Sequence, residues 1–513
     1  DNISLNNFRN LDADSEASAS YRTESYLGRV RYNYDQKYFG EVSIRRDGTS
    51  RFAKNNRWGT FWSVGASWIL TKEKFMQNID WLNYLKLRAA YGSVGNDAAA
   101  SAYTYLTLYN QYFTYDGYGT LFPSSIGVQN LKWEATKTLD IALEGSLFND
   151  RFNFTIGYFD KRNSDLLYPL TLPFSQGTLA NSGSLPSITQ NMCTMTNRGW
   201  ELQFGVDIIR NADLRWNFSL DASFVKNKIL SLPNGRDVVG QGLFQGKSLY
   251  EHFNYEWAGV DELTGNSLYY INPSSPEWYE YNSEGKFVFN QDLYDKTIAE
   301  AKSTGHYFED ENGVAYTDRT TYAKRKLMGT ALPTVYGSFG TTLSWKGINF
   351  GLLFTYSLGG KTYNGNYANL MSLNAQSPGA LHKDILNAWN GAPEGTVERE
   401  KVNGIYHINS GDVNANGVPA VDTTLDQYNN ASSSRWLVSN NYLALKNLNV
   451  SYDFPKKWVN ALSMQGLNLG FSVDNLFIIT RQKGLNPQYS NAGGQGAYYV
   501  PARVFSFQLT AKF

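Results

Sequence analysis

The feature that most constrains the fold of this chain is an alternation between short and long connections. The segments that they join run for about ten residues, the length of a tilted strand that crosses a bilayer. Tight connections occupy residues 35–37, 149–150, 211–213, 261–265 and 346–347. Long, polar connections rich in Gly, Asn and Tyr occupy residues 93–132, 162–198, 273–333, 359–440 and 477–502.

This asymmetry favours a membrane β-barrel over a soluble β-sandwich. A sandwich has no reason to place every short turn at one end and every long loop at the other. A bacterial outer-membrane barrel combines short periplasmic turns with long extracellular loops. We therefore predict an all-β fold, a transmembrane antiparallel β-barrel.

The last eleven residues, Arg503–Phe513, illustrate the strand pattern. Phe505, Phe507 and Leu509 alternate with polar residues, and period-two alternation places apolar side chains on one face of a strand. Taken alone, this segment favours the last strand of a soluble sandwich over the closing strand of a barrel. Because short and long connections alternate along the chain, we predict that this segment is the closing strand of a barrel and that the strand ends in the periplasm.

Composition agrees with a barrel and excludes other classes. Aromatic residues make up 15% of the 513 residues, and the 46 basic residues match the 46 acidic residues, so charge indicates no nucleic-acid partner. No window approaches 18 consecutive apolar residues, so we expect no transmembrane helix. Cys193 is the only cysteine and cannot form an internal disulfide.

The strand count predicts that strands are missing. We place about fifteen strands in the chain, whereas bacterial barrels have an even number. The first strand, near residues 24–34, and the last both run towards the periplasm. We therefore expect residues 1–513 to be the C-terminal portion of a larger barrel. Arg503–Phe513 should pair with the strand near 467–476 and, on its other side, with a strand outside this chain.

Several motifs resemble the SusC/RagA-type TonB-dependent transporters of Bacteroidetes. They follow the family's order from residue 25 to the end of the chain. The matching segments are Ser25–Tyr32, Ser43–Phe52, Asn56–Gly59, Leu85–Gly92, Gly259–Gly265, Leu332–Gly337, Asn441–Leu448, Asp474–Phe477 and the terminal Phe513.

The resemblance implies the rest of a transport machine. It implies a barrel of about 22 strands around a plug, so the plug and about seven early strands would belong to a separate chain or segment. It also implies energy from TonB–ExbB–ExbD and a SusD-like surface lipoprotein that acts as a lid. A dimer of such pairs, surrounded by lipid and lipopolysaccharide in the cell outer membrane, completes the expectation.

The function that the resemblance implies is active import of oligosaccharides, with no catalytic residues and no cofactor. Import of oligopeptides is the alternative within the fold. A passive porin or adhesin barrel is a second alternative. A surface hydrolase would need a convergent acid/base or nucleophile set, and the sequence spacing shows none.

Aromatic residues in the long connections are the candidate substrate contacts. They could stack on sugar rings or pack on peptide side chains. The alternative is that they pack loop on loop. The candidates are Tyr103, Tyr105, Tyr112, Tyr115, Trp278 and Tyr281.

One loop matches the start of a calcium-binding loop. Asp412, Asn414 and Asn416 place oxygen side chains at the first, third and fifth positions, and Gly417 is sixth. The twelfth position is Thr423 in place of the bidentate Glu. Calcium is one interpretation of this loop, and an Asn-Gly turn is the other.

The terminal Phe513 resembles the signal by which the barrel-assembly machinery closes the sheet. This interpretation follows from the resemblance and from the position of Phe513 at the end of an alternating strand.

Overall fold

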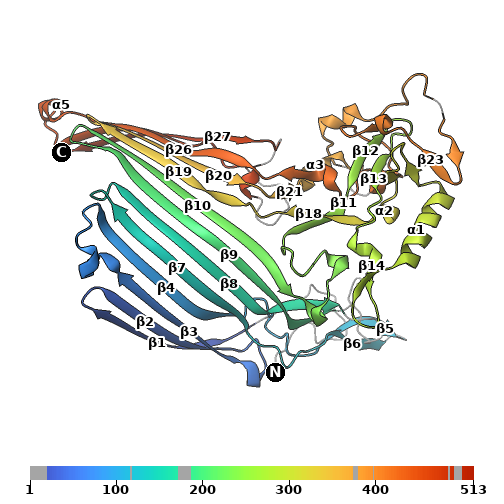
Figure 1. The fold of residues 1–513 in the computed structure, drawn as a ribbon, viewed down its shortest axis with the longest axis horizontal. Coiled ribbons are helices and arrows are strands. Elements are labelled where there is room, and N and C mark those ends of the chain that lie inside the picture. The colour runs from blue at the N-terminus through green and yellow to red at the C-terminus, as the bar shows by residue number, and fades with distance from the viewer. Residues whose placement is uncertain are drawn as a thin grey trace. The chain divides into compact units, whose positions relative to one another are not determined.

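Long antiparallel strands contribute most of the regular secondary structure (Figure 1). The computed structural model describes residues 20–115, 118–171, 187–373, 379–396, 398–482, 486–489 and 500–513. The chain divides into a first unit, residues 1–237 with 244–247, and a second unit, residues 238–243 with 248–513.

Eight long strands form the sheet of the first unit, and each pairs antiparallel with its neighbour in the order β1-β2-β3-β4-β7-β8-β9-β10. Alternating apolar side chains and tight turns produce these strands. Their bounds are β1 Thr23–Tyr34, β2 Tyr38–Thr49, β3 Trp58–Ile69, β4 Leu82–Asn96, β7 Glu134–Leu147, β8 Phe152–Thr171, β9 Ser187–Arg210 and β10 Leu214–Ser231.

Five long strands of the second unit follow the same pattern in the order β19-β20-β26-β27-β28. The predicted pairing of the last strand is confirmed, because Leu467 faces Ala511 and Val473 faces Phe505. The bounds are β19 Val335–Trp345, β20 Ile348–Leu358, β26 Tyr442–Asp453, β27 Gly466–Thr480 and β28 Val504–Lys512.

The ends of the long strands differ as the sequence predicts. In the second unit, β19 and β20 join through Lys346 and Gly347, and β26 and β27 join through the short helix α5 (Lys456–Ala461). At the opposite end, residues 359–441 carry further elements, among them α3 (Gly365–Met371) (Figure 1). The short and long connections therefore segregate to opposite ends of these strands.

One predicted tight turn is present but joins strands outside the main sheet, and this difference explains the strand count. The described residues have thirteen strands in the order of the main sheet, against the predicted count of about fifteen. Residues 261–265 turn between β12 (Trp257–Asp261) and β13 (Ser267–Tyr270). These two strands belong to a separate seven-stranded sheet, because a tight turn does not specify which sheet its strands join.

That seven-stranded sheet, here called the loop sheet, lies in the second unit. Its order is β22-β23-β16-β17-β13-β12-β24. Buried Leu268 and Ile408 belong to its core. The remaining bounds are β16 Phe308–Glu309, β17 Ala315–Thr317, β22 Lys401–Val402, β23 Ile405–His407 and β24 Val413–Asn414.

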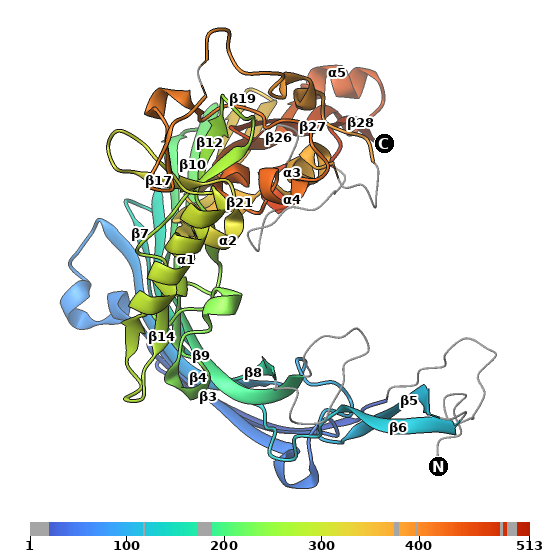
Figure 2. The ribbon, with the colours of Figure 1, turned by 90° about the vertical axis from the view of Figure 1, so that its right-hand side faces the viewer.

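Helix α1 (Gln291–Thr304) covers a second core of the same unit. The Asn290 side chain caps its first turn and Gly305, with φ +78°, ends it. Ala301 packs with Trp278 and Tyr322, and Figure 2 shows α1 beside the short helix α2 (Thr320–Ala323).

The other elements are short pairs in the long connections. The paired strands are β5 Leu108–Tyr115 with β6 Tyr118–Ser125, β11 Glu251–Tyr255 with β18 Arg325–Thr330, β14 Tyr279–Tyr281 with β15 Phe287–Phe289, and β21 Lys361–Tyr363 with β25 Leu437–Ser439. Helix α4 spans Asp426–Asn429. Among the described residues, no helix is long and apolar enough to span a bilayer.

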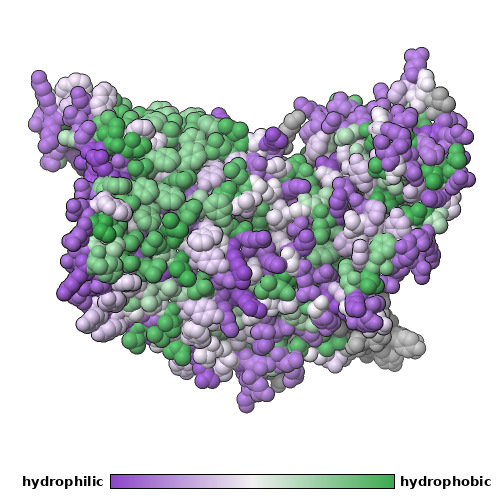
Figure 3. Space-filling model, viewed as in Figure 1, coloured by the Kyte–Doolittle hydropathy of each residue, from purple (hydrophilic) through white to green (hydrophobic). Residues whose placement is uncertain are grey.

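Each long sheet has one apolar face and one polar face. Register places Val30, Val42, Val64 and Tyr91 in one row of the first unit, and all four side chains are exposed, Val30 and Val42 by more than half. Apolar side chains gather over the long strands in Figure 3. An exposed apolar band of this kind is typical of strands that face lipid.

Candidate functional site

The polar face of the first unit is dense in charges and is here called the charged face. Five ion pairs join adjacent strands and one lies within β2, at N–O distances of 2.5–3.2 Å. The ion pairs are Arg29–Glu41, Arg31–Glu41, Arg45–Asp47, Lys86–Glu144, Arg88–Glu144 and Arg88–Asp140. Most of these side chains are between a quarter and two thirds exposed, so water and a partner can reach them.

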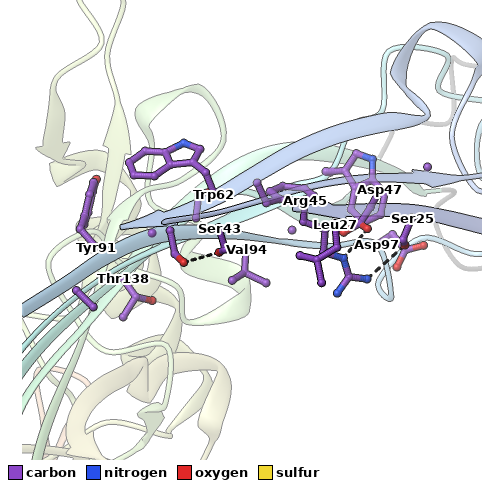
Figure 4. A pocket seen from close by; sticks show the side chains of 18 of the residues that line it. Ser25, Leu27, Ser43, Arg45, Asp47, Trp62, Tyr91, Val94, Asp97 and Thr138 are labelled. Carbon is purple, nitrogen blue, oxygen red and sulfur yellow. Dashed lines mark hydrogen bonds and ion pairs between the residues drawn. The ribbon is translucent and has the colours of Figure 1, made fainter. Parts of the chain in front are cut away.

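A hollow of about 560 Å³ lies on this face of the first unit (Figure 4). Arg45 contacts Asp47 at 2.6 Å there, and the hydroxyls of Ser43 and Ser63 form a hydrogen bond of 2.7 Å. Asp140 also lines the hollow. The arrangement offers hydrogen-bond and charge contacts to a neighbour and contains no nucleophile–base pair that would indicate catalysis.

The polar face of the second unit differs and is here called the neutral face. Most of its side chains are hydroxyls and amides, with glycines and the exposed Leu353 between them. Members in register are Ser338, Gly340, Thr342, Ser344, Asn349, Gly351, Asn447, Asn449, Ser451, Asn468, Gly470, Ser472, Ser506, Gln508 and Thr510.

Charged residues of these five strands lie at one end of the neutral face and midway along it. Asp453 ends β26 and Lys512 ends β28. Asp474 lies midway along β27 and faces Asn447, which in turn faces Leu353 in the middle of β20. Between these two levels, the row from Ser344 through Asn349, Ser451 and Gly470 to Gln508 carries no charge.

Amide side chains form a hydrogen-bond network on the neutral face. Asn349 and Asn468 both donate to the Asp453 carboxylate, at 3.0 and 2.8 Å. Midway along β26, Asn449 donates to Asn447 at 3.1 Å, and Asn447 donates to the Asp474 carboxylate at 2.7 Å. These groups are satisfied locally, so a solute would meet a hydrogen-bonding surface that includes the Asp453 and Asp474 carboxylates.

A buried ion pair holds the loop sheet together. Asp261 is fully buried, and both its oxygens accept hydrogen bonds from the Arg399 guanidinium, at 2.5 and 2.6 Å. Thr264 also donates to Asp261 at 2.8 Å. A bidentate pair with extra hydrogen bonds is the geometry in which a buried charge pair is satisfied.

Gly265 completes the turn that carries Asp261. Its φ is +76°, and a Cβ there would lie 2.5 Å from the Trp389 ring. The Trp389 indole N–H donates to the carbonyl oxygen of Glu262 at 2.8 Å. Glycine is therefore needed at this position both for its backbone conformation and for the indole packed on it.

The predicted aromatic contacts fall in both units of the chain. Tyr103 and Tyr105 are half-buried in the first unit. Tyr281 is half-buried in the β14–β15 hairpin, beside the Phe287 ring at 4.9 Å. Trp278 is fully buried, and its indole donates to the Asn272 carbonyl oxygen at 2.7 Å. Contact of a substrate with Trp278 would need this core to open.

Two further candidates, Tyr112 and Tyr115, lie on β5, but their side chains fall outside the described residues. A role in substrate binding for the six aromatic residues stays a prediction.

The predicted cation loop forms internal hydrogen bonds. Asn414 accepts from the backbone N–H of Asn416 at 3.0 Å and donates to Glu262 at 3.2 Å. Asp412 accepts from Asn409. Among the described residues, no group of three or more His, Cys, Asp or Glu could hold a metal ion. Calcium binding by this loop stays a prediction.

Two arginines were missed by the sequence analysis. Arg399 donates a hydrogen bond to Asp261, which lies 138 residues away in the sequence. No local sequence pattern around Arg399 indicates this contact. Arg435 stacks on Trp436 and Trp257, at 4.3 and 5.2 Å from the ring centroids. Burial lowers the pKa of Arg435 to about 10, so this side chain stays charged at neutral pH.

A family comparison identifies the architecture. The family described as TonB dependent receptor-like, β-barrel, matches residues 1–308, which is more than half of the chain. The chain belongs to this family. Its members are outer-membrane β-barrels and act as transporters, which agrees with the strand faces and the segregated connections.

Individual relatives are similar at lower identity. The TonB-dependent receptor SusC of Bacteroides thetaiotaomicron is 28% identical over 517 residues, which cover 98% of this chain and 45% of SusC. A TonB-dependent receptor of Formosa agariphila is 27% identical over 94% of this chain and 45% of its own length. The chain thus spans about half the length of the curated relatives that it matches.

The structure of the RagAB peptide transporter shares the fold. Its TM-score is 0.71 at 22% identity, covering 96% of this chain and 48% of the matched chain. This similarity confirms the fold alone.

Proposed function

We propose that this chain forms part of the wall of a TonB-energised outer-membrane importer of oligosaccharides. The chemistry of the neutral face supports oligosaccharides as the substrate class. It offers hydroxyl and amide groups without charge along the row from Ser344 on β19 to Gln508 on β28. Neutral glycans match such a surface, because they form many hydrogen bonds and carry no charge that the wall would have to compensate.

The proposal also includes further barrel strands, a plug and a lid. Every residue of the twelve-residue strand β1 is exposed in this chain, and β1 pairs only with β2 among the described strands. A long unpaired edge favours pairing with further strands. We propose that these strands and a plug come from residues outside the 513, and that a SusD-like lipoprotein covers the long connections as a lid.

Binding to the purified complete transporter tests the substrate class. A panel of neutral oligosaccharides and a panel of oligopeptides would be titrated by calorimetry. We expect heat only from members of the glycan panel. Binding restricted to peptides would overturn the glycan proposal and favour the second candidate, oligopeptide import, which the fold shared with the RagAB peptide transporter keeps open.

A passive porin or adhesin makes a different prediction. It would need neither TonB nor a lid, so growth on the imported nutrient would survive deletion of TonB. We propose no catalytic role for any residue of the chain. Hydrolysis of a panel glycan by the purified complex would contradict that proposal.

Phe513 is proposed as the assembly signal. It follows β28 and is 80% exposed, so a partner can reach it. Deletion of Phe513 should lower the yield of assembled barrel without altering substrate preference. Heat-dependent migration on gels measures assembly, and normal assembly of the deletion variant would contradict this role.

A further inference from the structure

A small hollow lies beside the edge strand β24 of the loop sheet and has a volume of about 150 Å³. One wall comes from the region of β12 and β24, and the other comes from residues 387–393. All of its lining residues belong to the second unit, and none lies on the charged face or the neutral face. The lining includes Glu262, Asn387, Trp389, Pro393, Asn414 and Val418.

Trp389 is fixed in the wall of this hollow. Its indole N–H donates to the carbonyl oxygen of Glu262 at 2.8 Å, and its backbone N–H donates to the carbonyl oxygen of Val418 at 2.9 Å. The ring packs on Gly265 and is only half-buried, so part of its surface lines the hollow. A ring that is already held in place loses little freedom when a ligand packs on it.

The Glu262 side chain supplies a hydrogen-bond acceptor at the same place. This carboxylate is half-buried and accepts from the Asn414 amide at 3.2 Å. Among the described residues, Asn414 is the group that bonds to it. A carboxylate has about four lone-pair sites, so hydroxyl groups of a ligand can donate to the remaining ones.

An aromatic wall beside a fixed acceptor suits a sugar ring. A pyranose has an apolar face of C–H groups, which can pack on an indole, and a rim of hydroxyls, which can donate to a carboxylate. The hollow is smaller than the about 300 Å³ at which sites for drug-sized ligands begin, so one sugar unit fits better than several. An acidic sugar would meet like charge at Glu262.

We propose that this hollow binds one neutral sugar unit of the imported oligosaccharide, with the sugar ring on Trp389 and a hydroxyl donating to Glu262. The inference rests on the proposed function, since it takes oligosaccharides as the transported class. It adds a binding site in the long connections, outside the long strands of the main sheet.

A cysteine at the rim of the hollow would report its occupancy. Asn387 lines the hollow and is exposed, whereas Glu280 on β14 is exposed and lies outside the lining. Single variants Asn387→Cys and Glu280→Cys would be made in the complete transporter and labelled with a maleimide after purification. The native Cys193 is buried, and the unsubstituted transporter measures its background.

Neutral oligosaccharides of glucose, mannose or galactose would be added during labelling. We expect one of them to slow the labelling of Asn387→Cys by about tenfold at ten times its Kd, because about one site in eleven then stays empty. The labelling rate of Glu280→Cys should not change. An oligogalacturonate of equal length should not protect Asn387→Cys, because its carboxylates are repelled by Glu262.

Removal of the carboxylate tests the contact itself. Glu262→Ala, combined with Asn387→Cys, should raise the saccharide concentration needed for protection by at least about tenfold, the loss expected for a hydrogen bond to a charged group. The backbone bonds of Glu262 to Asp412 and Trp389 do not involve the deleted atoms. Unchanged hydrogen exchange in β12 and β13 would confirm that the loop sheet stays folded.

The other outcomes separate this site from the proposed function. If a neutral oligosaccharide binds with measurable heat but does not protect Asn387→Cys, the site is wrong and the proposed function stands. Protection that is unaffected by Glu262→Ala, or that comes only from peptides or acidic saccharides, also contradicts the site. If no neutral oligosaccharide binds to the complete transporter, the proposed function fails and the site fails with it.

Discussion

Ion pairs in the loop sheet and on the charged face contrast in burial. Asp261 and Arg399 are 0% and 9% exposed and meet through two hydrogen bonds. Arg88 on the charged face is 40% exposed while it contacts Asp140 and Glu144. Arginine–carboxylate ion pairs thus occur both in the buried core of the loop sheet and on a solvent-exposed face.

The burial of an ion pair decides whether it contributes mainly to stability or mainly to contacts with a partner. Breaking a buried pair leaves an uncompensated charge, whereas an exposed pair contributes little because water replaces the lost partner. The pairs of the charged face therefore matter for what they present to a partner. The pair in the loop sheet matters because it connects segments that lie far apart in the sequence.

Removing the buried guanidinium should have the largest effect. Arg399→Ala leaves the buried Asp261 carboxylate without its guanidinium partner, and should destabilise the loop sheet by about 3–5 kcal/mol. Hydrogen exchange of the backbone amides of β12 and β13 in the complete transporter measures this loss. Arg45→Ala, which removes a 57% exposed partner of Asp47, is the control and should leave those amides protected. Equal protection of these amides in both variants would show that the buried ion pair stabilises the loop sheet no more than the exposed ion pair does.

A substitution at Gly265 should have the next largest effect. Gly265→Ala combines a positive φ with a Cβ 2.5 Å from the Trp389 ring, and should cost about 1–3 kcal/mol. Gly285→Ala is a matched control, because Gly285 has φ +73° but no heavy atom near the added Cβ. The same hydrogen-exchange measurement compares them. An equal loss in both variants would show that the Trp389 contact contributes nothing.

Acid should weaken the loop sheet through Asp310. Burial alone would raise the pKa of this carboxyl, but hydrogen bonds from the Val314 and Asn312 amides and the Tyr316 hydroxyl outweigh it and lower the pKa below 3.8. The stabilisation is therefore present above pH 3.8 and is lost as pH falls through the lowered pKa.

Pepsin cleavage between pH 2 and 5 would detect this acid weakening. Cleavage near the β16–β17 hairpin should increase below the ordinary pKa of 3.8. Asp310→Asn should be cleaved more readily than the parent at pH 5 and should show a smaller acid-dependent increase. A parent and variant with the same pH profile would contradict the assignment to Asp310.

The smallest effect is expected on the charged face. Arg88→Ala removes contacts to Asp140 and Glu144 at 2.5 and 2.8 Å, yet should change stability by less than about 1 kcal/mol because the group is solvated. Thermal unfolding of the purified transporter, with Lys86→Ala as the neighbouring control, measures it. A loss as large as that of Arg399→Ala would show that this face is structurally as important as the loop-sheet core.

The long strands were predictable because their information is local. Alternation at Phe505, Phe507 and Leu509 specifies the faces of β28, and the pairing of Leu467 with Ala511 follows from it. Tight turns at one end complete the pattern.

The loop sheet was not predictable, because its contacts are distant in sequence. The turn at residues 261–265 has the same local features as a barrel turn, and only Arg399 and the strand pairings show its place. Trp278 lies in a polar segment, and nothing in that segment indicates that its ring is completely buried. The ion pairs on the polar face of the first unit involve residues that the sequence shows, but the register was needed to see which of them face one another.

Uptake of a labelled oligosaccharide by cells that carry the complete transporter tests the central claim most directly. The cells would be compared with and without TonB, and surface binding would be measured separately at low temperature. The proposal predicts that import stops without TonB while surface binding is retained. Import that continues at the same rate without TonB would contradict it.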